Sequence, residues 1–379
     1  MHNALDDAAS GDDGPDDAAL RELAAASVRV LLDGQHHGGA YVACPTFEPY
    51  RHAWLRDGAF CALALSRAGH ADSAERFFCW AAETVAGQSG LVARAIAGAD
   101  GSGEAYLPAR YALDGRRLDD GWWDRQPDGY GTWLWVMEQH RRRHGRLGTG
   151  HAEGIRLTVD YLVARWAAPS FDWWEEHDGH RHTATLAAIA AGLRASAGWD
   201  VLDHDRRARA AATADRVRAA IRTRGVRNGR LTKWLDDSDS VDASLIACAT
   251  PFDEFEPDDP VFAATLAEIE RALVHGDGVH RHPADTFYGG GQWLLLAGLL
   301  GLHYARVGRR GRAGELLRWI ATRHRDHELP EQVRDHMLAP EHLDEWLRRW
   351  GEPACPLLWS HAMYLLLALD LGVPLPATG

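Results

Sequence analysis

Apolar and polar residues follow each other along most of the chain with the spacing of amphipathic helices, and the two-residue alternation of half-buried strands is almost absent. This pattern predicts about twelve helices. They cover roughly residues 17–33, 56–68, 71–86, 129–145, 152–167, 182–197, 204–223, 240–248, 259–274, 289–307, 311–324 and 358–371. Asp16 or Asp17 can cap the first helix, and Gly69 and Gly198 follow the second and the sixth.

This number of helices, with no short repeat and no linker rich in Pro, Gly and Ser, favours an all-α fold. We expect an (α/α)6 barrel, a single domain over residues 17–379, in which inner helices close a ring and outer helices surround it. The segments predicted to lie between helices are 35–54, 88–128, 168–181, 226–239, 275–288 and 325–357. They contain most of the motifs rich in Trp, Arg and carboxylates, which indicates a pocket at one mouth of the ring.

The charge and the hydropathy of the chain exclude several classes of partner. A net charge of −13 over 379 residues argues against nucleic acid and anionic membranes, because both attract positive charge. No apolar run approaches the ~18 residues of a transmembrane helix. Residues 1–16 are rich in Asp, Ala and Gly and lack the basic start and apolar core of a signal peptide, so we expect a disordered acidic tail.

Five cysteines are an odd number, and none of them has CxxC spacing. They are Cys44, Cys61, Cys79, Cys248 and Cys355. This distribution indicates free thiols in a reducing compartment and neither a disulfide framework nor a zinc site. We therefore expect a cytoplasmic protein, which would meet imported oligosaccharides and not polymer granules.

Two glutamates lie in aromatic, loop-like settings far apart in the sequence. Glu175 belongs to segment 172–176 (Asp-Trp-Trp-Glu-Glu), and Glu331 to segment 329–332 (Leu-Pro-Glu-Gln). Hydrolysis of a glycosidic bond needs one protonated carboxyl group to release the leaving group and one ionised group to activate water. Taken alone, a Trp-Trp-Glu-Glu string is more often the end of a helix. An indole beside Glu175 would nevertheless suit a sugar ring and raise the pKa of the carboxyl group.

Sixteen Trp are unusually many for a chain of this length, and several lie beside acidic residues outside the predicted helices. These are Trp54, Trp122, Trp123, Trp173 and Trp174. They are compatible with a large core and equally with stacking platforms around a sugar site.

Seven motifs in a fixed order resemble the family 15 glycoside hydrolases, which include glucoamylases, bacterial trehalases and isomaltose- or dextran-cleaving glucohydrolases. The resemblance extends from about Tyr41 to about Leu369. The motifs are Tyr50 with 54–57 (Trp-Leu-Arg-Asp), 126–131 (Gln-Pro-Asp-Gly-Tyr-Gly), 174–176 (Trp-Glu-Glu), 242–245 (Asp-Ala-Ser-Leu), Arg281 with 285–288 (Asp-Thr-Phe-Tyr), 329–332 (Leu-Pro-Glu-Gln) and 358–362 (Leu-Trp-Ser-His-Ala).

The resemblance implies an (α/α)6 barrel and an inverting mechanism, with Glu175 as the general acid and Glu331 as the general base. It further implies polar and aromatic groups around the terminal sugar. Arg56, Asp57 and Arg281 would bind its hydroxyl groups, Trp54, Trp122, Trp174 and Trp359 would form its aromatic walls, and Glu176 would assist on the side of the leaving group. As the base, Glu331 must be ionised, and neighbouring donors such as Gln332 or Tyr50 could support this form.

Two features depart from the family pattern. Phe287 stands where many members have Tyr, so a phenolic partner of Tyr50 or Asp57 is missing. Tyr50 would then be free to contact the nucleophilic water, and we expect either an auxiliary base role or packing alone. The chain also shows neither a large N-terminal β-sandwich nor a starch-binding module, which disfavours polymeric substrates.

These observations predict an exo-acting, inverting α-glucoside hydrolase that releases β-glucose from the non-reducing end of a small substrate. Among small substrates we expect isomaltose, because the compact one-domain form and the presence of Phe at position 287 are features that resemble those of the isomaltose glucohydrolases. Trehalase and glucoamylase activities are the alternatives. We expect no cofactor, no nucleic acid and no membrane partner, and the sequence indicates no oligomeric state.

Other classes of function explain less of the sequence. Histidines cluster at 177–182, 275–282 and 324–327, but their spacing fits no zinc-binding helix, so no metal site is expected. A non-catalytic helical toroid would explain the helices but not the two glutamates in ordered motifs. A terpene-cyclase-like α-barrel would need Asp-rich metal motifs that are not convincing here.

Overall fold

The fold is built from helix pairs, as the hydrophobic pattern predicts. A computed structural model describes residues 16–98, 105–145, 147–237 and 239–375. The α-helices are α1 (Asp17–Asp33), α2 (Leu55–Arg67), α3 (Ala71–Gly87), α4 (Ser89–Ala97), α5 (Asp128–His144), α6 (Ala152–Arg165), α7 (Thr183–Ser196), α8 (His204–Arg224), α9 (Pro260–Leu273), α10 (Leu294–Arg306), α11 (Arg310–Ala321), α12 (Leu343–Trp350) and α13 (Leu358–Asp370).

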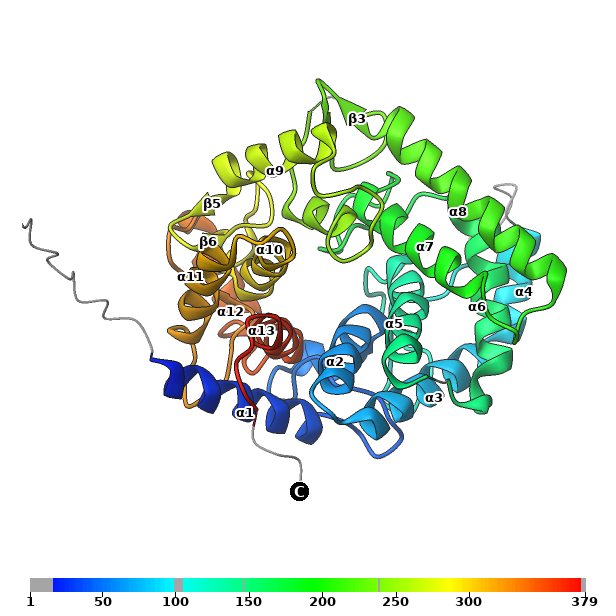
Figure 1. The fold of residues 1–379 in the computed structure, drawn as a ribbon, viewed down its shortest axis with the longest axis horizontal. Helices are drawn as coiled ribbons and strands as arrows, with labels where there is room; N and C mark the ends of the chain where they lie inside the picture. The colour runs from blue at the N-terminus through cyan, green and yellow to red at the C-terminus, as the bar shows by residue number, and fades with distance from the viewer. Residues whose placement is uncertain (1–15, 99–104, 146, 238, 376–379) are drawn as a thin grey trace, which may run out of the picture.

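A closed ring of inner helices lies at the centre of the molecule (Figure 1). In order around the ring, α2 contacts α5, α5 contacts α7, and α7 contacts the 3-10 helix η3 (Ala243–Cys248). The ring continues from η3 through α10 and α13 back to α2. Helices α1, α3, α6, α8, α9 and α11 lie outside it (Figure 1). The predicted (α/α)6 barrel is thereby confirmed, with a 3-10 helix as one inner member.

The inner helices are apolar on nearly all sides because they are packed between the ring and the outer layer. Every described residue of α10 from Leu294 to Tyr304 is buried, as is every residue of α13 from Leu358 to Ala368. Helices α5 and α7 approach closely where Gly131 meets Gly192, and a Cβ atom on Gly192 would lie 2.3 Å from the carbonyl oxygen of Gly131. Glycine is therefore required at this crossing.

The expected helices match the observed ones closely, with two omissions. The additional helices α4 and α12 lie in segments that the pattern places between helices. Asp16 caps α1, since its carboxylate accepts a hydrogen bond of 2.8 Å from the amide of Ala19. The expected acidic tail falls, apart from Asp16, on residues 1–15, which lie outside the described residues. No helix in the described parts of the chain is long and apolar enough to cross a membrane.

The strands are short, two residues each, and form four antiparallel pairs. They are β1 (Ala53–Trp54) with β2 (Arg110–Tyr111), β3 (Val226–Arg227) with β4 (Arg230–Leu231), β5 (Val274–His275) with β6 (Gly278–Val279), and β7 (Gln292–Trp293) with β8 (Gln332–Val333). Strands β1 and β7 run directly into the inner helices α2 and α10. The loops paired with them are thus held at the end of the ring where inner helices begin.

Candidate active site

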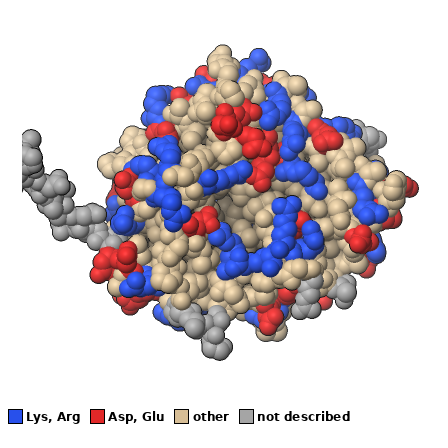
Figure 2. Space-filling model, viewed as in Figure 1, with Lys and Arg blue, Asp and Glu red and all other residues tan. Residues whose placement is uncertain are grey.

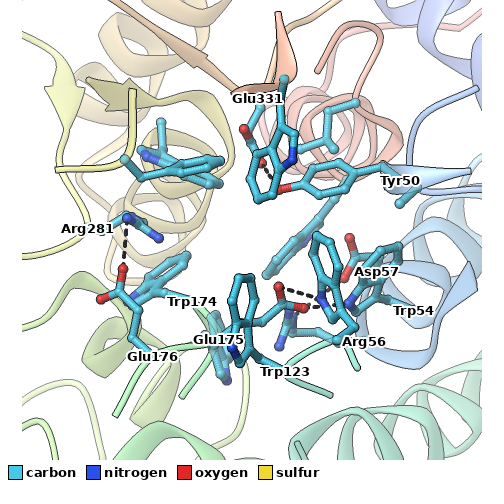
Figure 3. Close-up of a pocket in the computed structure, with 18 of the residues that line it drawn as sticks. Tyr50, Trp54, Arg56, Asp57, Trp123, Trp174, Glu175, Glu176, Arg281 and Glu331 are labelled. Carbon is cyan, nitrogen blue, oxygen red and sulfur yellow. Dashed lines mark hydrogen bonds and ion pairs between the residues drawn. The ribbon is translucent and has the colours of Figure 1, made fainter. Parts of the chain in front are cut away.

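One cavity of about 340 Å³ lies at this end of the ring, where loops precede the inner helices. Its volume is at the lower end of the roughly 300–1,000 Å³ typical of small-molecule sites. The predicted site residues all line it: Tyr50, Trp54, Arg56, Asp57, Trp122, Trp174, Glu175, Glu176, Arg281, Glu331 and Trp359. Figure 3 shows Glu331 and Glu175 projecting into the pocket from opposite sides. The barrel therefore brings together segments that are far apart in the sequence.

The loop that presents Glu175 is organised by Asp172, which is buried. One carboxylate oxygen of Asp172 accepts hydrogen bonds from the amides of Trp174 (2.9 Å) and Glu176 (2.8 Å). The other oxygen pairs with Lys233 at 2.9 Å, and the same ammonium group lies 3.0 Å from Asp242. The turn places Glu175 at φ 65°, a backbone conformation that is costly for a residue with a Cβ atom. The buried ion pairs hold this conformation and aim the carboxyl group into the pocket.

Both oxygens of the Glu175 carboxyl group are occupied by indole donors. Trp54 donates to one oxygen and Trp122 to the other, each at 2.8 Å. Burial raises the pKa of Glu175 to about 7, although these two hydrogen bonds favour the ionised form. A carboxyl group with this pKa keeps its proton in much of the population at neutral pH, as a general acid requires.

Glu331 lies immediately before strand β8 and is buried. Its amide donates to the carbonyl oxygen of Ala354 at 2.8 Å, and the phenol of Tyr50 donates to its carboxyl group at 3.0 Å. The expected contact with Tyr50 is therefore present. Burial nevertheless raises the pKa of Glu331 to about 8, despite the opposing effects of Tyr50, Arg281 and Gln332. The neighbouring donors do support the ionised form of this carboxyl group, as expected, but desolvation by burial outweighs them.

Tyr50 has a partner in the pocket although Phe287 carries no hydroxyl group. The hydroxyl donates to Glu331, and the ring packs edge-on against Trp54 with centroids 5.5 Å apart. Burial and the two nearby carboxyl groups raise the pKa of Tyr50 well above its ordinary value. A phenolate is therefore disfavoured, and this argues against Tyr50 as a base. Its geometry is that of a donor that orients Glu331.

Arg56 and Asp57 lie in the first turn of α2 and face the floor of the pocket. The Arg56 guanidinium group donates to Asp128 at 3.0 Å and lies 4.9 Å from the ring centroid of Trp359. Burial raises the pKa of Asp57 to about 6, with Arg56 acting in the opposite direction. One oxygen of Asp57 is buried without a hydrogen-bond partner among the described residues. A forked donor beside an acceptor suits vicinal hydroxyl groups of a sugar.

A second polar cluster surrounds Arg281 on another side of the pocket. Its guanidinium group donates to both oxygens of Asp285, at 2.8 Å for Nε, and lies 3.3 Å from Glu176. The other oxygen of Glu176 is 3.0 Å from His282 Nε2. Burial opposes ionisation of Glu176, but Arg281 and His282 outweigh it and lower its pKa to about 2. Glu176 is thus ionised at neutral pH, in contrast to its neighbour Glu175.

The aromatic walls are locked by contacts behind the pocket. Trp174 donates its indole N–H to Asp242 at 2.9 Å, and its ring lies 5.4 Å from the Arg281 guanidinium carbon. Trp359 stacks on Phe60 with centroids 5.6 Å apart and an interplanar angle of 17°. These rings therefore have fixed orientations in the absence of a ligand.

Helix α12 contributes pocket residues that the sequence interpretation missed. Trp346, Arg349 and Trp350 all line the cavity, and Trp293 and Trp173 also reach it. The signal was present, because apolar residues at 343, 346, 347 and 350 have helical spacing. Phe287 packs edge-on against Trp346 at 4.9 Å. The position that departs from the family pattern therefore supports α12 and not Tyr50.

A single group of potential metal ligands occurs in the described residues: Asp172, Glu176 and His177. Its two carboxylates are already paired with cations of the protein. Lys233 pairs with Asp172, and Arg281 with Glu176. The protein's own positive charges thus satisfy these carboxylates, and the group is part of the loop scaffold.

The pocket contains the groups that acid–base cleavage of a glycosidic bond needs. Two buried carboxyl groups, Glu175 and Glu331, approach from opposite sides and have raised pKa values. Aromatic faces and paired charges surround the space between them. This arrangement suits a sugar ring whose hydroxyl groups lie inside the pocket and whose glycosidic bond lies toward the mouth.

Comparison with known proteins also indicates a glycoside hydrolase. The family described as glycosyl hydrolases family 15 matches residues 22–318. The chain is 46% identical to an isomaltose glucohydrolase of Kribbella flavida over 374 residues, which cover 95% of each protein. It is 27% identical to an uncharacterized glycosyl hydrolase of Methanocaldococcus jannaschii, over 88% of this chain and 53% of that protein.

Solved structures agree with these sequence matches. A glycosidase variant in complex with glucose superimposes with a TM-score of 0.91 at 46% identity and covers 96% of this chain and 100% of that one. A bacterial glucoamylase complexed with acarbose has a TM-score of 0.75 at 19% identity and covers 93% of this chain and 55% of that one. At this identity the second likeness concerns the fold alone.

Proposed function

The chain belongs to glycosyl hydrolase family 15, and from this premise we propose an inverting, exo-acting α-glucoside hydrolase with isomaltose as its substrate. It is a glycoside hydrolase, so the alternatives of a non-catalytic toroid and a terpene cyclase fall away. The single observation that carries the proposal is the pair Glu175 and Glu331 on opposite sides of one aromatic pocket. The identity to an isomaltose glucohydrolase supports the choice of disaccharide.

In the proposed reaction, the terminal glucose unit lies between the two carboxyl groups. Glu175 gives its proton to the glycosidic oxygen as the bond from that oxygen to the anomeric carbon breaks. Glu331 takes a proton from a water molecule on the opposite face of the ring, and the water oxygen bonds to the anomeric carbon. Glu175 ends ionised, Glu331 ends protonated, and exchange with solvent restores both. Attack from the opposite face yields β-glucose from an α-glucoside.

The active pair must hold one proton between its two carboxyl groups. Since burial raises both pKa values, to about 7 and about 8, the singly protonated pair is most populated slightly above neutral pH. The hydrogen bond from Tyr50 lowers the pKa of Glu331 and so acts toward the microstate in which Glu331 is the ionised member, although burial still leaves this pKa above that of Glu175. Arg56, Asp57 and Arg281 are proposed to bind the hydroxyl groups of the terminal sugar, with Trp54, Trp122, Trp174 and Trp359 around its ring.

A substrate panel read by glucose release tests this proposal. Isomaltose, trehalose, maltose, panose and dextran are compared at equal concentration of non-reducing ends. We expect the highest kcat/KM with isomaltose and little activity on dextran. Preference for trehalose or for maltose would replace the substrate assignment by one of the two alternatives. A lack of glucose release from all five substrates would overturn the proposed function itself.

A further inference from the structure

Arg349 on α12 differs from the other arginines that line the pocket. Its side chain is exposed, and its guanidinium carbon lies 4.7 Å from the ring centroid of Trp350 and 5.3 Å from that of Trp346. Within the described parts of the chain it forms no ion pair and no side-chain hydrogen bond. Arg56 and Arg281, by contrast, are buried and paired with carboxylates. The guanidinium N–H groups of Arg349 are therefore available to a ligand.

Packing places this guanidinium group on the side of the general acid. Arg349 lies over Trp350, Trp350 stacks on Trp122 with centroids 5.9 Å apart and an interplanar angle of 21°, and Trp122 donates to Glu175 at 2.8 Å. The indoles of Trp350 and Trp122 thus lie between Arg349 and Glu175, the group proposed to protonate the leaving oxygen. A leaving group bonded to that oxygen must extend toward this corner of the pocket mouth.

An exposed aromatic ring lies at the same corner. Trp123 is 41% exposed, which makes it the most exposed of the large hydrophobic residues in the described parts of the chain. It lines the cavity, its ring centroid is 5.5 Å from that of Trp122, and Figure 3 shows it next to Glu175. An indole kept exposed beside a polar pocket is typical of sugar stacking, since the ring offers an apolar face at the edge of water.

We propose that Trp123 and Arg349 bind the leaving-group sugar, with Trp123 as the stacking surface and Arg349 as a donor to its hydroxyl groups. Trp350 positions Arg349 by direct packing, and it also stacks on Trp122, the ring against which Trp123 packs. The leaving-group site is thus formed by α12 and the segment before α5, and the ligand that it would take is neutral and rich in hydroxyl groups. This inference rests on the proposed glycosidase function and assigns residues to the part of the substrate that departs.

The test compares a substrate that has a leaving-group sugar with one that has none. Arg349→Ala and Trp123→Ala are assayed with isomaltose and with α-glucosyl fluoride, whose leaving group is a fluoride ion. We expect kcat/KM for isomaltose to fall about tenfold in each variant, mainly through KM, as for loss of one charged hydrogen bond or one stacking contact. The value for the fluoride should stay within about twofold of wild type.

Arg348→Ala provides the matched control, since Arg348 is the neighbouring exposed arginine of α12 and does not line the cavity. It should leave both substrates unaffected, and Arg349→Lys should lie between wild type and Arg349→Ala. Unchanged isomaltose kinetics in Arg349→Ala and Trp123→Ala would overturn the inference, and so would equal losses on both substrates. Failure of the wild-type enzyme to cleave isomaltose while it cleaves the fluoride would count against the proposed substrate instead.

Discussion

The acid side and the base side of the pocket hold their carboxyl groups in different local structures, but both groups are buried and both have raised pKa values. Glu175 lies on a strained loop, which buried ion pairs around Asp172 hold in place, and both of its oxygens accept from indoles. Glu331 lies at the start of a short strand and accepts from one phenol. Burial nevertheless raises both pKa values by similar amounts, to about 7 and about 8.

The pKa values of Glu175 and Glu331 alone therefore do not show which carboxyl group is the acid and which is the base. Desolvation acts alike on two carboxyl groups in one cavity, and the roles come from what each group faces. Glu175 faces the indoles of Trp54 and Trp122, with Trp123 beside Trp122, and Glu331 faces Tyr50. A leaving group that needs no proton therefore separates the two roles more sharply than a titration does.

The largest effect is expected on the base side. Glu331→Gln removes the group that accepts the proton of water, and we expect turnover of isomaltose to fall by about 10²–10⁴ or more. The same loss should appear with α-glucosyl fluoride, because attack by water is needed for both substrates. Steady-state kinetics with a thermal unfolding control measure this. Retention of more than a tenth of the wild-type rate would remove Glu331 from its role.

Glu175→Gln removes the proposed proton donor and leaves the base Glu331 in place. Turnover of isomaltose should fall by about 10²–10⁴, since a sugar alkoxide is a poor leaving group without protonation. Fluoride leaves without help, so hydrolysis of α-glucosyl fluoride should lose less than about tenfold. The ratio of the two rates is the measurement. Equal losses on both substrates would contradict a role confined to protonation of the leaving oxygen.

The pH dependence of kcat/KM should reflect both buried carboxyl groups. Below the lower apparent pKa, near about 7, both groups are protonated and the base is absent. Above the upper one, near about 8, both are ionised and the acid is absent. We expect a bell-shaped profile with a maximum between these values and a loss of up to about tenfold per pH unit outside them. A maximum near pH 4–5, where free carboxyl groups titrate, would disagree with burial as the dominant influence.

Tyr50→Phe is a smaller change to the base side. The Tyr50 hydrogen bond lowers the pKa of Glu331, so its loss raises that pKa further and leaves less carboxylate at neutral pH. We expect turnover to fall about tenfold, with KM nearly constant, and the alkaline limb of the profile, which follows the upper pKa, to move to higher pH. Near-normal turnover with an unmoved limb would mean that Tyr50 only packs against Trp54.

Phe287→Tyr should have the smallest effect. Its ring packs against Trp346, and Tyr50 already has Glu331 as its partner. We expect kcat/KM to stay within about threefold and the alkaline limb to stay in place. A displaced alkaline limb would restore the idea that this position controls Tyr50.

The sequence was sufficient for the architecture and for most lining residues. Buried inner helices such as α10 and α13 carry a strong apolar signal, and the motifs around Glu175 and Glu331 stand in an ordered series that resembles the family. Helix α12 was missed for a physical reason. It has eight residues, none of them buried, and it contacts mainly two 3-10 helices, η4 (Phe287–Gly289) and η5 (Pro340–His342), while Trp350 alone packs against the core.

Electrostatics could not be predicted in the same way. The donors to Glu175 come from residues 54 and 122, and the donor to Glu331 from residue 50, so these contacts exist only after the ring has closed. Nor does sequence spacing indicate how deeply a carboxyl group is buried. The raised pKa of Glu331 and the protonated state of Tyr50 both follow from that burial.

Glu175 and Glu331 are proposed to act on opposite faces of one sugar ring, Glu175 on the glycosidic oxygen and Glu331 through a water molecule. Proton NMR of the first glucose released from isomaltose tests it most directly, if spectra are recorded before mutarotation. We predict that β-glucose accumulates first and that transglycosylation products stay scarce, because a base across water inverts the anomeric carbon. Early accumulation of α-glucose would show a retaining mechanism and contradict the division of roles between these two carboxyl groups.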